Sequence, residues 1–167
     1  TCGILALMYW QWRPIPGTLW EVESTAGKAV IYALFALGWV LVFYASFLIN
    51  HFDLFGLRQV VLYFRGRHYT HVPMKVMGLY KLVRHPLMLG FLIAFWATPT
   101  MTYGHLLFSL AMSAYIFVGI HFEERTLNAE LGPVYRAYQK RTPMIVPMPP
   151  KPGVSTDVPG MSDTATR

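Results

Sequence analysis

The chain has 167 residues and a net charge of +6, and its residues are 54% apolar, 16% aromatic and only 13% charged. Soluble domains carry about 25% charged residues, so this composition excludes an ordinary soluble domain and indicates an integral membrane protein. The single cysteine, Cys2, excludes an internal disulfide and any all-cysteine metal site.

The length predicts one all-α domain, a polytopic membrane helical bundle over residues 1–146, followed by a disordered tail over residues 147–167. The tail is rich in Pro, Gly, Ser, Thr and Asp, and such a composition buries too little apolar surface to fold. Residues 2–12 are apolar but too few to cross a bilayer. Because the first residue is not Met, we expect them to end a helix whose beginning is absent from the chain.

Residues 29–49 contain no charged side chain and predict a full transmembrane helix. Residues 54–64 mix bulky apolar side chains with Arg58 and Gln59, a pattern typical of a helix at the membrane interface. The basic segment that follows, residues 65–78, contains Gly and Pro and is expected to be a surface loop.

A second run without Asp, Glu, Lys or Arg extends over residues 86–122. As one helix it would be about 55 Å long, but the hydrocarbon core of a bilayer is about 30 Å thick. The helix-breaking residues near 98–104 therefore divide it into a hairpin with arms at 87–97 and 105–122. Because a hairpin brings its ends to the same membrane face, Arg84 and His85 should lie near Glu123 and Glu124.

The second arm is expected to continue to Leu131, where Gly132-Pro133 ends it, and residues 134–141 predict a short amphipathic helix. Basic residues collect between the predicted helix 29–49 and the hairpin, and again after the second arm of the hairpin. The positive-inside rule makes both groups cytoplasmic, so we expect a multi-pass protein with a cytoplasmic C-terminus. Membrane orientation also explains the net charge without a nucleic-acid partner. His68 and His71 lack further ligands nearby, and no metal is expected.

Charges of both signs at the open end of the hairpin suit a zwitterionic ligand such as an amino-acid headgroup. Arg84 and His85 precede Pro86, where free N–H groups and the helix dipole favour an anion. A carboxylate of Glu123 or Glu124 would attract a cation. The alternative is a solvated helix end with an ordinary surface ion pair.

Residues 78–86 read Gly-Leu-Tyr-Lys-Leu-Val-Arg-His-Pro, and Gly90, Glu123-Glu124 and the pair Tyr135 and Tyr138 follow. This pattern closely resembles the isoprenylcysteine carboxyl methyltransferase and phospholipid N-methyltransferase group over about residues 78–147. Within that group, the segments at 10–14, 50–59 and 101–105 resemble the bacterial methanethiol S-methyltransferases.

The resemblance implies an S-adenosylmethionine-dependent enzyme that methylates a small thiol, methanethiol, to dimethyl sulfide. A carboxylate would hold the ammonium of the cofactor, Arg84 or His85 its carboxylate, and Gly90 would allow close backbone approach. The tyrosines would cover the adenine or the sulfonium, or else anchor the chain at the membrane interface. The implied cofactor-binding set is Tyr80, Arg84, His85, Gly90, Glu123, Glu124, Tyr135 and Tyr138.

The thiol must lose a proton, because the thiolate is the nucleophile and the pKa of a thiol lies above about 8. His51 and Asp53, just after the predicted helix 29–49, are candidates for the base or relay. Their alternative role is a helix C-cap and turn. Two other functions stay open: methylation of an isoprenylated cysteine or a lipid amine, and a non-catalytic accessory role in nitrogen-oxide metabolism.

Overall fold

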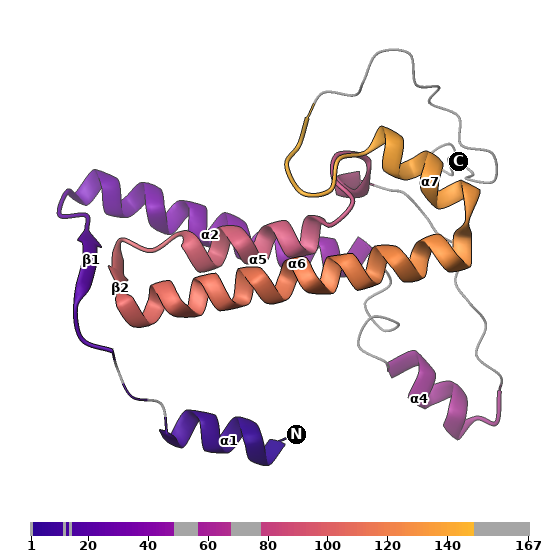
Figure 1. Cartoon of the computed structure of the whole chain (residues 1–167), viewed down its shortest axis with the longest axis horizontal. Coiled ribbons are helices and arrows are strands. Elements are labelled where there is room, and N and C mark those ends of the chain that lie inside the picture. Colours follow the sequence, from indigo (N-terminus) through magenta and orange to yellow (C-terminus); the bar gives the residue numbers. More distant parts are fainter. Residues whose placement is uncertain (1, 12, 14, 49–56, 68–77, 149–167) are drawn as a thin grey trace.

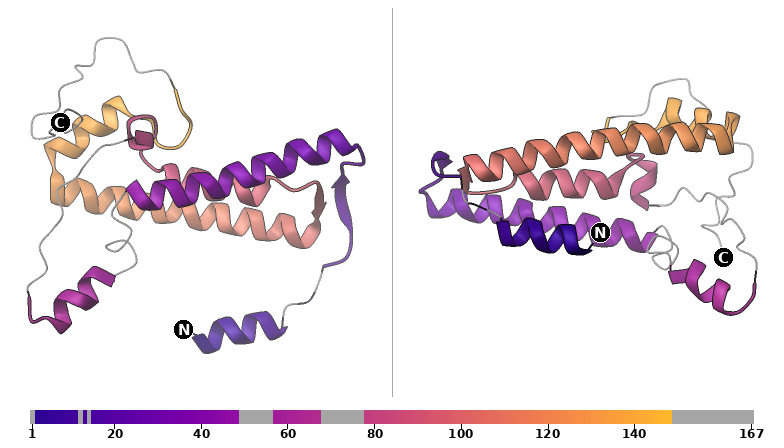
Figure 2. Two further views of the ribbon diagram at one scale, coloured as in Figure 1. Left: turned by 180° about the vertical axis from the view of Figure 1, so that it is seen from behind. Right: turned by 60° about the horizontal axis from the view of Figure 1, so that its bottom comes forward.

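The structure, a computed structural model, describes residues 2–11, 13, 15–48, 57–67 and 78–148. Helix α5 lies between α2 and α6 along the long axis, and α7 folds back at one end (Figures 1 and 2). In chain order the elements are α1 (Cys2–Gln11), β1 (Thr18–Glu21), α2 (Thr25–Leu48), α4 (Leu57–Phe64), the 3-10 turn η1 (Gly78–Lys81), α5 (Pro86–Trp96), β2 (Thr100–Thr102), α6 (Tyr103–Leu131) and α7 (Pro133–Arg141). The predominance of helix confirms the fold class in its main feature.

The long helix α2 begins at Thr25, earlier than the predicted start at residue 29. The Ser24 hydroxyl oxygen accepts a hydrogen bond from the Gly27 amide at 3.1 Å, which satisfies one of the free N–H groups at the helix start. Lys28 therefore lies in the first turn of the helix, and not in the preceding loop.

Two helices, α2 and α6, are long and apolar enough to cross a membrane. In the most apolar 18-residue stretch of each helix, the buried share is only 22% in α2 and 17% in α6. Large apolar side chains such as Val40, Phe47 and Val118 are exposed along their length. A core helix of a soluble protein would be mostly buried, so these faces suggest contact with lipid.

Helix α5 (Pro86–Trp96) matches the predicted first arm of the hairpin, residues 87–97, to within one residue at each end. It has 11 residues, about 16 Å at 1.5 Å per residue, and does not cross the hydrocarbon core as a helix. Polar side chains of α6 satisfy its last carbonyls. The Phe95 carbonyl oxygen lies 2.8 Å from both His105 Nε2 and the Ser109 hydroxyl. The Phe95 carbonyl in the last turn of α5 is therefore paired with α6 side chains.

A short antiparallel strand pair joins the end of α5 to the N-terminal part of the chain, so the all-α prediction is wrong in this respect. β1 pairs with β2, with Thr18 opposite Thr102 and Glu21 opposite Thr100. The Val22 amide extends the pairing by donating to the Pro99 carbonyl at 2.9 Å. Backbone groups beyond α5 thus obtain partners from the segment between α1 and α2.

Candidate functional site

The open end of the hairpin gathers the four charged or titratable residues that the sequence predicted there. Arg84 and His85 precede α5, and Glu123 and Glu124 lie on α6. Arg84 Nε is 2.7 Å from Glu124 Oε1, and both side chains are largely buried. The predicted fold-back of the uncharged run is therefore confirmed by direct contact between its two flanking clusters.

Arg84 is bound on several sides. Besides Glu124, its Nη1 donates to the Gln139 carbonyl at 3.0 Å and to the Thr142 carbonyl at 2.6 Å. These two carbonyls belong to the last turn of α7 and to its C-cap, where the helix itself offers no N–H group to pair with them. Arg84 consequently ties the start of α5 to both α6 and α7.

Glu124 is saturated in a similar way. Its Oε1 accepts from Arg84 and lies 3.2 Å from His85 Nε2, while its Oε2 accepts from Gln139 Nε2 at 3.1 Å. With both oxygens engaged, Glu124 acts within the protein as the centre of the network.

Glu123 has a more open environment. Its side chain is 49% exposed, and among the described residues its closest polar contact is His85 Nδ1, 3.5 Å from Oε2. The His85 ring is 5% exposed and lies between the two carboxylates. Glu123 is thus the acid in this cluster with capacity to bind a cationic group from outside.

The segment after α7 fixes the start of α5. The Arg84 amide donates to the Pro143 carbonyl at 2.9 Å, and the His85 amide donates to the Met144 carbonyl at 3.1 Å. Ile145 packs with Ile116 and Ile120 of α6 in an apolar cluster that includes Met144. Backbone pairing and apolar packing therefore hold the side chains of Arg84 and His85 against α6.

The tyrosines that the sequence assigned to the cofactor lie in or beside this network. Tyr135 and Tyr138 are fully buried, and the Tyr138 hydroxyl donates to the Tyr80 carbonyl at 2.6 Å. In this arrangement neither ring of α7 presents a face to a bound molecule. Of the three tyrosines, Tyr80 is the one that is only partly buried.

Burial raises the pKa of all three phenols further above neutral pH. It is the main cause that raises the pKa of Tyr135 to about 12, with the negative charge of Glu124 as the next contribution. Burial also raises the pKa of Tyr138. The pKa of Tyr80 is raised by burial and then by the charge of Glu123. All three are hydrogen-bond donors at neutral pH.

Gly90 contacts a neighbouring helix. A Cβ atom built on Gly90 would lie 2.7 Å from the Gly38 carbonyl oxygen, and one on Gly38 would lie 2.8 Å from the Gly90 carbonyl oxygen. Such distances leave no room for a side chain at the crossing of α2 and α5. The close backbone approach expected at Gly90 is thus made to α2, whereas the sequence assigned it to the cofactor.

Sequence reasoning missed Gln139 and the carbonyl of Thr142. The amphipathic pattern of residues 134–141 placed the two tyrosines on one face, but nothing in it marked Gln139 as a partner of Glu124. A backbone carbonyl carries no signal in the sequence at all. The predicted base or relay residues, His51 and Asp53, and residues 149–167 of the predicted tail lie outside the described residues.

Neither a family model nor a solved structure matches the chain, but several curated proteins do. It is 52% identical over 145 residues to methanethiol S-methyltransferase of Mycobacterium tuberculosis, covering 87% of this chain and 59% of that protein. It is 54% identical over 144 residues to methanethiol S-methyltransferase 2 of Bradyrhizobium diazoefficiens, covering 86% and 55%. Nurim of Xenopus laevis is more distant, 29% identical over 125 residues, covering 69% and 44%. The chain spans little more than half the length of the first two relatives.

Proposed function

We propose that this homologue of the methanethiol S-methyltransferases forms the cofactor-binding part of an enzyme that methylates methanethiol to dimethyl sulfide. The observation that carries the proposal is the identity of about half of the residues to proteins of that name over most of this chain. The motif residues that suggested the activity from the sequence also lie together at one end of the hairpin. Neither the lipid-directed nor the non-catalytic alternative is favoured by these relatives.

S-adenosylmethionine would supply a methyl group on a sulfonium, which is a good leaving group. The donor set of the site fits its zwitterionic headgroup, because Glu123 is a half-exposed carboxylate with His85 and Tyr80 beside it. We assign the ammonium of the cofactor to Glu123. Arg84 and Glu124 already satisfy each other, so their role is to hold α5, α6 and α7 in place around that carboxylate.

We further propose a multi-pass arrangement in which α2 and α6 span the bilayer, with the C-terminus in the cytoplasm. The exposed apolar surfaces of both helices support the spans. The basic residues at the α7 end support the orientation, because Arg125, Arg136 and Lys140 lie there. The charged cluster would then face the compartment that contains the soluble cofactor.

Replacing Glu123 by glutamine is expected to weaken binding of S-adenosylhomocysteine, the demethylated cofactor, by about 10- to 150-fold. The physical reason is the loss of a charge-assisted hydrogen bond, which contributes about 1.5–3 kcal/mol. Calorimetric titration of the purified protein in detergent measures the affinity. Glu130→Gln, an exposed acid on the same helix, is the matched control and should bind normally. Unchanged affinity in Glu123→Gln contradicts the assignment.

His51 and Asp53 remain our candidates for the base or relay that accepts the thiol proton. If either residue accepts the proton, wild-type turnover should change little with pH below the thiol pKa. The turnover of the His51→Ala or Asp53→Asn variant should instead rise steeply as the pH approaches that pKa. Headspace gas chromatography of dimethyl sulfide at a series of pH values gives the profile. Cofactor affinity should be unchanged in both variants. If both variants kept the wild-type pH profile of turnover, neither residue would be the base or relay for the thiol proton.

A further inference from the structure

Helix α4 presents an aromatic surface that the described part of the protein leaves uncovered. Tyr63 and Phe64, at its last turn, are 82% and 83% exposed, and their ring centroids lie 6.2 Å apart in an edge-to-face arrangement. Val60 and Val61 are about half exposed. The helix stands clear of the bundle at the end that carries α7 in each view (Figures 1 and 2). An apolar patch of this kind marks an interaction surface.

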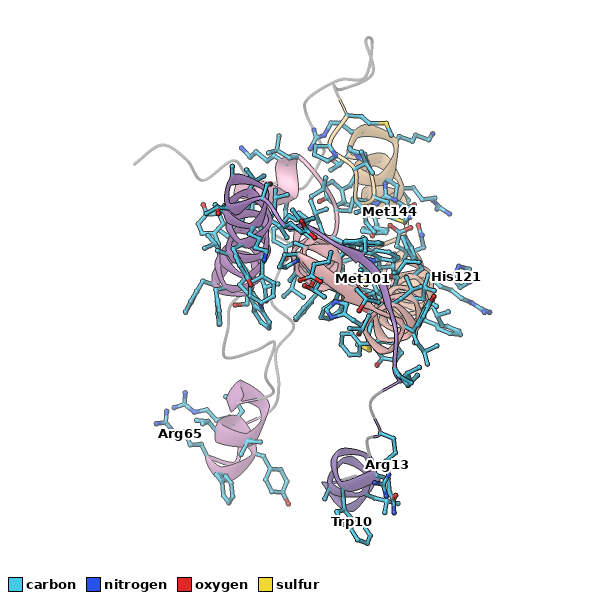
Figure 3. All side chains as sticks on the ribbon, turned by 90° about the vertical axis from the view of Figure 1, so that its left-hand side faces the viewer. Trp10, Arg13, Arg65, Met101, His121 and Met144 are labelled. Atoms are coloured by element: carbon cyan, nitrogen blue, oxygen red, sulfur yellow. The ribbon has the colours of Figure 1, made fainter. Side chains whose placement is uncertain are left out.

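Two arginines, Arg65 and Arg67, follow Tyr63 and Phe64 at the end of α4. Gly66 has a φ of 62°, and the Arg67 amide donates to the Leu62 carbonyl at 2.9 Å while the Gly66 amide donates to the Tyr63 carbonyl at 3.1 Å. This is the Schellman pattern of helix termination, in which a glycine reverses the backbone. Arg65 and Arg67 are both exposed, and residues 57–67 contain no acid. Figure 3 shows Arg65 on α4, away from the side chains of the bundle.

We propose that α4 with Arg65 and Arg67, which we call the α4 anchor, lies in an anionic lipid surface. Aromatic rings beside basic side chains are the composition of helices that lie in the headgroup region, where the rings enter the acyl boundary and the cations meet lipid phosphates. The anchor lies at the same end of the bundle as the charged cluster (Figure 1). The anchor is independent of methyl transfer, because it involves none of the residues of the cluster.

The test uses a fluorescent label at position 64 of the full chain in vesicles. Cys2→Ser removes the single cysteine, and Phe64→Cys then takes one environment-sensitive fluorophore. The vesicles contain phosphatidylcholine with or without phosphatidylglycerol. We expect quenching by doxyl-labelled lipid and protection from aqueous iodide. A label at Glu130→Cys, an exposed position on α6, is the reference for an aqueous site. Tyr63→Cys is a second position for the case in which labelling at 64 disturbs the fold.

The charge of the surface is tested with Arg65→Glu combined with Arg67→Glu. Each arginine near an anionic surface favours binding by about fivefold, so losing both positive charges lowers the immersed-to-free ratio of the anchor by about 30-fold in anionic vesicles. The two new negative charges are repelled by the surface, so the expected loss is at least about 30-fold. Arg136→Glu with Lys140→Glu makes the same charge change on α7 and should leave the label unaffected. Iodide access at 64 equal to that at 130 overturns the proposal. Protection from iodide without quenching by doxyl lipid also overturns it, since a protein then covers α4.

Discussion

Arg84→Met is expected to lower the free energy of unfolding by about 3–5 kcal/mol, because it leaves Glu124 as a buried carboxylate without its cationic partner. The change also removes the donor to the Gln139 and Thr142 carbonyls, which join α7 to the rest of the network. Unfolding in detergent, followed by circular dichroism, measures the loss. Arg136→Met is the matched control, since Arg136 is exposed on α7.

The partner of this change is Glu124→Gln, which keeps the shape of the side chain and removes its charge. The double variant should be less destabilised than the sum of the two single variants, because removing both charges leaves no unpaired ion. If Arg84→Met were no more harmful than Arg136→Met, the ion pair would not hold the three helices together. The site would then depend on the backbone pairing of residues 84 and 85 alone.

Gly90→Leu is expected to be at least as damaging, costing about 3 kcal/mol or more. The new side chain would start 2.7 Å from the Gly38 carbonyl oxygen and 2.9 Å from the Val42 amide nitrogen, and backbone atoms cannot move aside as a flexible side chain can. The crossing of α2 and α5 would have to widen. The same unfolding measurement applies, together with cofactor affinity, since α5 carries His85 at its start.

Gly119→Leu on α6 is the matched control for this substitution. No atom of the described residues lies within 4 Å of a Cβ atom built at Gly119, so a side chain there meets no neighbour among them. Leucine also has a better helix propensity than glycine, by somewhat less than about 1 kcal/mol, which favours the variant. Equal stability of the two variants would mean that α2 and α5 do not pack closely at Gly38 and Gly90.

The hairpin could be predicted because a physical limit required it. An uncharged run too long for one crossing must return, and its flanking charges then meet, as Arg84 and Glu124 do. The hydrogen-bond partners at and just beyond the end of α5 could not be predicted in this way. They come from β1, which lies far away in the sequence, and from the side chains of His105 and Ser109 on α6.

The division of roles between the two glutamates was equally hidden. Adjacent helical residues point about 100° apart, so one must face the bundle and the other must face outward. Which one does so is decided by the rotation of α6 about its axis, and that rotation is set by the apolar packing of Ile116 and Ile120. The burial of Tyr135 and Tyr138 likewise depends on how α7 packs against the rest of the protein. The sequence showed only that the two tyrosines share one face of that helix.

The strand pair has a consequence for how the protein is assembled. β1 precedes α2 and β2 follows α5, so the two strands are far apart in the chain. In the multi-pass arrangement proposed above, they can meet only after the hairpin turn has been translocated to the side of the bilayer that holds β1. Pairing of Thr18 with Thr102 therefore comes late in biogenesis, and a crosslink between these positions would report that membrane insertion of the hairpin is complete.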